Sequence, residues 1–440
     1  MDQLENLSPE TLEAMDLTQQ AHLLATKEMY EDAYDLLAKA QEADPMYVGA
    51  YVEEGNIRTL EDELDLAEAC YEKGLQVNKN DGALHYSIGN LKLLRGEFKD
   101  AIAEYRTAEE LGYEDEHMTV NLGYCHEELG DADSAMVAYI RAGRQNPEWV
   151  DPVAHRINLL AVTGQMEEAE SLCKTALERF PLELSVYALM IDILVEKDNY
   201  DEAEECLKVA LEIFPDDKDL RLQKVRLYGL KGRYEEAHAE VAKLREEITD
   251  PESLDALDTI EANLYLGEEK PDQAIESCKA RISRETDGMV DVEARNMLME
   301  LLSAQKRYTE LLELTNDCLK KKNADDFFIR AIVLQPYALE QLGRTEEAML
   351  LYKEGLTKLR MLAVSDSTRT EARVYRIMCL RGLKQYDKAL EELDYCEKLA
   401  GTNDAIRTLR AQLLMDKGDK EAAKAIMDGL QEKARKTLGI

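Results

Sequence analysis

The chain has 440 residues, of which 45% are hydrophobic and 33% are charged, so it has enough apolar material for a packed core. Its 91 Asp and Glu outnumber its 54 Lys and Arg, and the formal net charge is −37. Because phosphate backbones and anionic lipids attract cations, this charge argues against nucleic acid and membrane as partners. The chain has no apolar run near the ~18 residues of a membrane span and begins without the apolar core of a secretory signal. We therefore expect a cytoplasmic protein.

An alanine recurs every 34 residues through the first half of the chain, at Ala33, Ala67, Ala101, Ala135, Ala169, Ala203 and Ala237. Two further residue types recur at fixed distances from these alanines. Prolines lie twelve residues after four of these alanines, at Pro45, Pro147, Pro181 and Pro215. Glycines lie five residues before four of them, at Gly96, Gly130, Gly164 and Gly232. Three registers that share one period indicate a repeated structural unit.

Each unit is interpreted as two helices joined by a short turn. The first helix, of about 14 residues, ends near the glycine, which can adopt the positive φ of a helix C-terminus. The alanines allow the two helices to approach closely, and the proline marks the end of the second helix because it supplies no amide hydrogen. Apolar residues recur at helical spacing and no window alternates as a strand does, so the fold is predicted to be all-α.

This pattern resembles the tetratricopeptide repeat (TPR) family, whose unit is a helix–turn–helix of 34 residues. The unit that begins at residue 116 carries the pattern well, with Leu122-Gly123, Gly130, Ala135, Tyr139, Ala142 and Pro147. The resemblance implies a right-handed TPR superhelix, an α-solenoid of about 12 helix-turn-helix repeats. Seven contiguous repeats are predicted, beginning at residues 14, 48, 82, 116, 150, 184 and 218.

The spacing loosens after residue 251. Units are predicted there at 255–288, 292–325, 329–362, 370–403 and 404–437. Pro336 occupies a position where the family usually has a small residue, so kinked or longer helices are expected. The chain is thus divided into an N-terminal leading segment (1–13), seven regular repeats (14–251), and about five irregular TPR-like repeats with a C-terminal capping helix (252–440). Ser8-Pro9-Glu10 suits a helix start.

Charge follows the same division. Residues 1–251 carry 24 basic and 56 acidic residues, a net charge of −32, whereas residues 252–440 carry 30 and 35, a net charge of −5. One interpretation is that the solvated faces of the regular helices are simply acidic. The other is that they attract a basic partner. The sequence leaves both open.

No catalytic or metal-binding motif is present. The chain lacks a P-loop, a G-x-S-x-G and an H-E-x-x-H, and its six histidines are spread over five units without i,i+4 pairing. The eight cysteines are spread out without a C-x-x-C pair and are interpreted as reduced, small apolar helix residues. We therefore expect no enzyme activity, no catalytic residues, no metal and no cofactor.

The family resemblance implies that a binding site lies on the concave face, which first helices line. The central position of these helices holds His22, Asn56, Asn90, Tyr124, Asn158, Asp192, Arg226, Asn263, Glu300, Tyr337, Met378 and Gln412. A carboxamide both donates to and accepts from an extended peptide backbone. The candidate residues for peptide or partner binding are therefore Asn56, Asn90, Tyr124, Asn158, Asn263 and Tyr337.

The leading hypothesis is a non-catalytic protein–protein interaction scaffold or adaptor that binds a peptide or partner protein on its concave face. One alternative is a regulatory sensor, in which a peptide or small ligand alters the superhelix. Another is a purely structural assembly subunit. The sequence does not identify the partner, which is a protein or peptide and is basic under the second interpretation of the charge.

Overall fold

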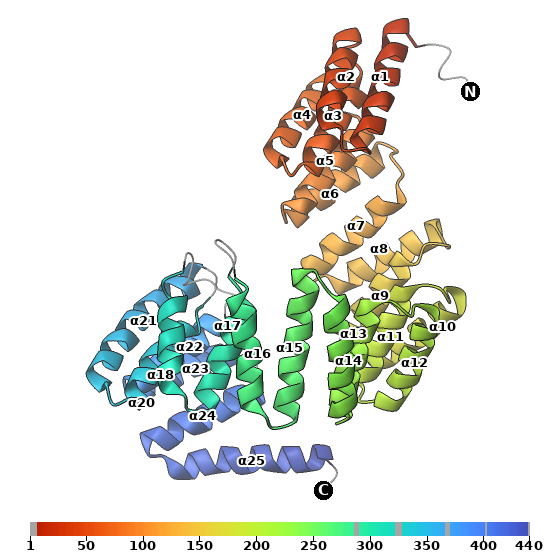
Figure 1. The fold of residues 1–440 in the computed structure, drawn as a ribbon. Coiled ribbons are helices and arrows are strands. Elements are labelled where there is room, and N and C mark those ends of the chain that lie inside the picture. The colour runs from red at the N-terminus through yellow and green to blue at the C-terminus, as the bar shows by residue number, and fades with distance from the viewer. Residues whose placement is uncertain (1–6, 286–289, 322–327, 366–369, 401–402, 439–440) are drawn as a thin grey trace. The chain divides into compact units, whose positions relative to one another are not determined.

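The computed structural model describes residues 7–285, 290–321, 328–365, 370–400 and 403–438. Within these ranges the chain forms 24 helices and no strand (Figure 1). The all-α prediction is therefore confirmed. The chain divides into two compact units, Met1–Leu220 and Arg221–Ile440, which are described separately below.

The first unit consists of helix pairs joined by short turns. Its helices are α1 (Pro9–Ala25), α2 (Tyr30–Ala43), α3 (Val48–Leu60), α4 (Leu64–Val77), α5 (Gly82–Leu94), α6 (Phe98–Glu110), α7 (Glu116–Glu128), α8 (Ala132–Gln145), α9 (Asp151–Val162), α10 (Met166–Arg179), α11 (Leu184–Glu196) and α12 (Tyr200–Ile213).

The second unit continues the pairs with less regular lengths. Its helices are α13 (which begins just before the boundary, Lys218–Leu230), α14 (Tyr234–Glu247), α15 (Pro251–Gly267), α16 (Pro271–Ser283), α17 (Val292–Ala304), α18 (Tyr308–Cys318), α20 (Ala331–Gln341), α21 (Thr345–Ser365), α22 (Thr370–Gly382), α23 (Tyr386–Ala400), α24 (Asp404–Lys417) and α25 (Lys420–Leu438).

The turn between paired helices repeats one backbone conformation. A residue shortly after the first helix has a positive φ, at Glu28, Asp62, Gly96, Gly130, Gly164, Asp198, Gly232, Glu269, Lys306, Gly343, Lys384 and Gly418. At Gly130 the amide donates to Glu127 O, and the next amide, of Asp131, donates to His126 O, both at 2.8 Å. This Schellman motif satisfies the last carbonyls of α7. The predicted role of the glycines is confirmed, and the same turn forms where glycine is absent.

The proline and alanine registers also have the predicted roles. The helices α2, α8, α10 and α12 each end two residues before a proline, at Pro45, Pro147, Pro181 and Pro215. All seven alanines of the 34-residue register are fully buried. In α1 the helix begins at Pro9 and Ser8 accepts a 3.1 Å hydrogen bond from the Thr11 amide. Residues 9–13 of the predicted leading segment therefore belong to the first helix.

Close approach within a pair depends on a glycine and a tyrosine. A Cβ atom added at Gly123 of α7 would lie 2.5 Å from the ring of Tyr139 on α8, and that ring is fully buried. The same relationship joins Gly89 to Tyr105. A larger residue than glycine would push the two helices apart, so glycine here determines packing distance.

The irregular repeats contain the longer helices that the sequence led us to expect. Helix α21 has 21 residues and α25 has 19, whereas the longest helix of the regular repeats, α1, has 17. Pro336 lies inside α20 and is buried. The two compact units are separated at residue 220 on the basis of spatial contacts. The predicted boundary at residue 251, between regular and irregular repeats, is based on repeat spacing and stays a prediction.

Seven of the eight cysteines are buried. Burial raises the pKa of Cys70 and Cys379 to about 12, so these thiols stay protonated at neutral pH. Within the described residues, no helix combines the length and the apolar character needed to cross a membrane.

Candidate functional site

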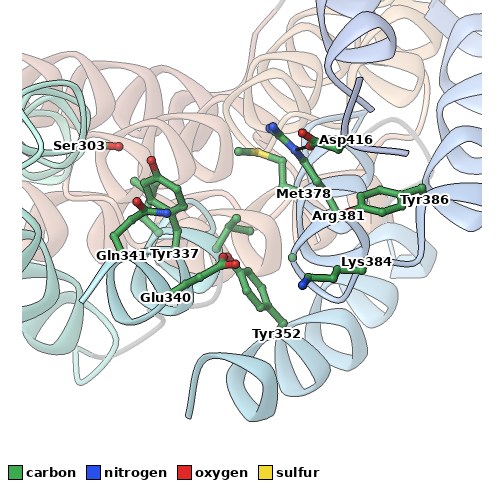
Figure 2. A pocket seen from close by; sticks show the side chains of 13 residues that line it. Ser303, Tyr337, Glu340, Gln341, Tyr352, Met378, Arg381, Lys384, Tyr386 and Asp416 are labelled. Atoms are coloured by element: carbon green, nitrogen blue, oxygen red, sulfur yellow. Dashed lines mark hydrogen bonds and ion pairs between the residues drawn. The ribbon is translucent and has the colours of Figure 1, made fainter. Parts of the chain in front are cut away.

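A cavity of about 500 Å³ lies in the second unit, between α20 and α22 (Figure 2). Four successive first helices, α17, α20, α22 and α24, contribute side chains to it. Most of the residues that these helices contribute occupy the ninth, twelfth or thirteenth position of a predicted unit. The residues at these positions are Ser303 from α17, Tyr337, Glu340 and Gln341 from α20, Met378, Arg381 and Gly382 from α22, and Asp416 from α24. We call this cavity the α20–α22 groove.

Aromatic rings form much of the wall of the groove. Tyr337 meets the ring of Tyr308 edge-on, with 5.9 Å between ring centroids. Tyr352 is only 3% exposed, and its hydroxyl donates a 3.2 Å hydrogen bond to Glu340. Burial, followed by the neighbouring Glu340 carboxylate, raises the pKa of Tyr352 well above its usual range. This hydroxyl is therefore a hydrogen-bond donor at all physiological pH values.

A glycine allows Tyr352 to reach this position. A Cβ atom added at Gly382 would lie 2.4 Å from two carbon atoms of the Tyr352 ring. The ring therefore packs directly on the backbone of α22 at the groove. The groove depends on this close contact between consecutive repeats.

Charged side chains of both signs surround the aromatic wall. The guanidinium of Arg381 pairs through Nε with Asp416 Oδ2 (Figure 2). Its Nη1 donates to Gln412 Oε1 at 3.3 Å. Lys384 is exposed in the left-handed turn after α22, at φ 58°. Within the described part of the chain its ammonium has no ion-pair partner. The groove therefore presents apolar, cationic and anionic surface side by side.

Of the six candidate residues from the sequence, only Tyr337 lines this groove. Met378, from the same central position, lies there too. Asn263 is exposed on α15 but is not part of the groove. In the first unit Asn158 is exposed, and Tyr124 is 39% exposed with its ring edge-on to Phe98.

Asn56 and Asn90 are engaged in packing between helices. The hydroxyl of Tyr71 donates to Asn56 Oδ1 at 2.8 Å, and that of Tyr105 donates to Asn90 Oδ1 at 2.7 Å. Asn90 Oδ1 also accepts from Asn121 Nδ2 at 3.1 Å. Their carbonyl oxygens therefore serve the packing of the helix pair, whatever else their amide nitrogens contact.

The sequence analysis missed Glu340, Lys384 and Tyr352, because it followed one central position per helix. A signal existed, since residues three and four positions further along a helix lie on the same face. Glu340 and Gln341 follow Tyr337 at this spacing, and Arg381 and Gly382 follow Met378. Among the described residues, no group of three or more His, Cys, Asp or Glu side chains is arranged to hold a metal ion.

Successive helix pairs joined by the same left-handed turn define the class of α-solenoid repeat proteins. Models of the tetratricopeptide repeat match residues 86–148 and the overlapping segments 160–217 and 194–258. The chain therefore contains tetratricopeptide repeats, and the predicted family is confirmed. These repeats form protein–protein interaction scaffolds and are typically non-catalytic.

Several solved structures are similar to parts of the chain. One is YrrB, described as a TPR protein with an unusual peptide-binding site, at 24% identity over 41% of this chain and 93% of YrrB, with a TM-score of 0.35. Another is a thermophilic TPR protein of Thermus thermophilus, at 24% identity over 43% and 99% of the two chains, with a TM-score of 0.36. A third is a tetratricopeptide repeat protein of Parabacteroides merdae, at 16% identity over 66% and 98%, with a TM-score of 0.38. No curated protein matches the sequence.

Proposed function

We propose that the chain is a non-catalytic scaffold that holds an extended segment of a partner protein in the α20–α22 groove. The observation that carries this proposal is the convergence of four successive first helices on one cavity. Extended segments suit such a surface because each repeat offers contacts to the next part of the segment. On this proposal the groove is part of the concave face that the family resemblance implies.

The side chains of the groove indicate what the partner segment contains. Tyr337 and Met378 offer apolar contact area, and aromatic and methionine side chains are enriched at the centres of interfaces. Lys384 and Arg381 can pair with a carboxylate of the partner segment beside its apolar anchor, and Glu340 can accept a hydrogen bond from a donor group of that segment. The segment that fits best therefore has an apolar anchor residue flanked by charged residues.

The exposed candidates from the sequence extend this proposal along the chain. Asn158, Tyr124 and Asn263 present free surface at the same helical position as Tyr337. We propose that the two asparagines contact a partner backbone, since an exposed carboxamide can both donate and accept. Asn56 and Asn90 would contribute through their amide nitrogens alone.

Charge supports a basic partner for the first unit. Residues 1–220 carry 17 basic and 50 acidic residues, a net charge of −33, and residues 221–440 carry 37 and 41, a net charge of −4. On this proposal, association of a partner with the first unit slows as salt rises, because exposed charges are screened over about 8 Å at physiological ionic strength. An association rate independent of salt would contradict a basic partner.

The test uses the full chain as bait in an extract of its source cells, with recovered partners quantified by mass spectrometry. Tyr337→Ala and Met378→Asp remove the apolar anchor of the groove, whereas Arg226→Ala changes the exposed residue at the same helical position of α13, outside the groove. We expect partner recovery to fall about tenfold or more in the first two variants, because truncation of one anchor residue typically weakens binding by that factor. Recovery should stay unchanged in the third variant. A partner that binds all three variants equally would contradict the groove proposal and favour a structural assembly subunit.

A further inference from the structure

A second cavity, of about 540 Å³, lies in the first unit between α8, α9 and α10. Its apolar wall includes Met136, Leu159 and Leu172. Arg156 of α9 also lines it. We call this cavity the Arg156 pocket. It belongs to the first unit alone and is independent of the α20–α22 groove.

The charge of Arg156 is not compensated within the described residues. Its Nε is buried without a hydrogen-bond partner, and no ion pair joins its guanidinium to any described carboxylate. Burial, and then repulsion from Arg144, lower the pKa of Arg156. Asp133 and Glu168 line the same pocket but are exposed and do not pair with it. An unpaired arginine is unexpected in a unit with a net charge of −33.

The chain itself shows how this position is normally neutralised. Arg156 is the seventh residue of its predicted unit. The seventh residues of three other units are also basic, and each of them is neutralised. Lys224 and Arg376 each pair with a glutamate sixteen positions later, and Arg410 pairs with Asp394 and Glu397 of the preceding helix. Lys224 Nζ lies 3.2 Å from Glu240, and Arg376 Nη1 lies 3.0 Å from Glu392.

In the unit that contains Arg156, the residue sixteen positions later is Leu172. The internal partner is therefore replaced by a leucine that lines the pocket. A buried polar group without a partner costs free energy, so its presence calls for an explanation. The replacement both frees the guanidinium and provides an apolar wall beside it.

We propose that the Arg156 pocket binds a ligand carboxylate whose attached apolar group packs against Met136, Leu159 and Leu172. A guanidinium matches a carboxylate through two parallel hydrogen bonds. The nearby Asp133 and Glu168 disfavour a doubly charged phosphate and leave room for one negative charge. The carboxylate belongs either to a free aliphatic acid or to the C-terminal residue of a partner chain.

The experiment measures binding of small probes to the full chain by isothermal titration calorimetry and saturation-transfer NMR. The probes are 4-methylpentanoate for a free acid, N-acetyl-L-leucine for a chain terminus, and 4-methylpentanamide as the neutral control. We expect saturable binding of at least one acid at concentrations up to about 10 mM, and at least about tenfold weaker binding of the amide. Preference for N-acetyl-L-leucine assigns the pocket to a chain terminus, and preference for 4-methylpentanoate assigns it to a free acid.

Three variants test the residues. Arg156→Gln removes the charge, and Leu172→Glu restores the internal partner found in the units of Lys224 and Arg376. Both are expected to weaken binding of the acid at least about tenfold while circular dichroism shows an unchanged helix content. Arg179→Gln, on α10 but outside the pocket, is expected to bind like the unmodified chain. Absence of binding by both acids, equal binding of acid and amide, or full binding by Leu172→Glu would overturn the proposal.

Discussion

The hydroxyl of Tyr71 donates a 2.8 Å hydrogen bond to Oδ1 of Asn56. The ring that carries this hydroxyl lies against Gly55, where an added Cβ would come within 2.2 Å of it. Glycine, asparagine and tyrosine thus lock the two helices of one repeat together. An asparagine that the sequence suggests for partner contact therefore also has a structural role.

Gly123→Ala tests the close contact between paired helices. Alanine is the better helix former by about 1 kcal/mol. However, its Cβ would lie 2.5 Å from the fully buried ring of Tyr139, and overpacking of this kind costs about 1–3 kcal/mol. We expect a net loss of unfolding free energy in urea denaturation.

Gly143→Ala is the matched control for this prediction. Gly143 is also inside a helix, but an added Cβ would meet only Pro152 Cβ, at an ordinary 3.7 Å. We expect this variant to be as stable as the unmodified chain or more stable by about 0.5–1 kcal/mol. If Gly123→Ala matched Gly143→Ala, the packing argument would be wrong.

Asn90→Leu separates structural asparagines from exposed ones. It removes the acceptor of Tyr105, whose side chain is fully buried, and of Asn121. An unsatisfied buried donor costs about 1–3 kcal/mol, so thermal unfolding should occur at a lower temperature. Asn158→Ala changes an exposed residue and is expected to stay within about 0.5 kcal/mol. Equal effects of the two substitutions would contradict the distinction.

Glu240→Gln tests the ion cluster of the second unit. Glu240 is 6% exposed and accepts from Arg221 Nε at 2.8 Å and from Lys224 Nζ at 3.2 Å. Burial alone would raise the pKa of Glu240, but these two cations outweigh it and lower the pKa. Loss of one member of a buried ion cluster costs about 3–5 kcal/mol, which denaturant unfolding of the full chain can detect. The exposed Glu235→Gln on the same helix should have almost no effect, and a similar loss in both variants would argue against the cluster.

His85 makes the first unit sensitive to pH. Its Nδ1 lies 2.6 Å from Glu104 Oε2, and its Nε2 lies 3.0 Å from the carbonyl oxygen of Lys79. Burial alone would lower the pKa of His85, but these two acceptors outweigh it and raise the pKa above 6.5. Because the folded pKa exceeds the unfolded one, the stabilisation is complete below about pH 6.5 and is lost as pH rises through the folded pKa.

The corresponding measurement compares urea midpoints of the unmodified chain and His85→Gln from pH 5.5 to 8.5. The unmodified chain should lose its advantage over His85→Gln as pH rises across this range. A constant difference between the two midpoints would mean that folding does not raise the pKa of His85.

The helix pairs could be predicted because their determinants are local. The alanine equivalent to Ala135 recurs in every regular unit and the proline equivalent to Pro147 in four of them, and each has one physical role within its own pair. The left-handed turn could be predicted only where glycine marks it. Asp62 and Lys384 adopt the same conformation without glycine, because the helices on both sides determine the turn.

The candidate sites were harder to predict because they depend on contacts between distant residues. Tyr352 fits beside the α20–α22 groove because Gly382, thirty residues later, leaves room for its ring. In the regular units the tyrosine instead packs on a glycine of its own helix pair, as Tyr139 does on Gly123. Arg156 is notable only beside Leu172, once the structure shows that Glu240 neutralises Lys224 at the equivalent position. Asn56 could be placed on its helix but not paired with Tyr71 from spacing alone.

The most direct test of the central claim is photo-crosslinking from within the α20–α22 groove. The photoreactive residue p-benzoylphenylalanine replaces Tyr337 in one full-length variant and the exposed Arg226 of α13 in another, and both are irradiated in an extract of the source cells. The account predicts that position 337 cross-links to one defined segment of a partner protein, that an excess of the unmodified chain competes for it, and that position 226 gives none of this product. Equal cross-linking at both positions, or no competed product at position 337, would contradict it.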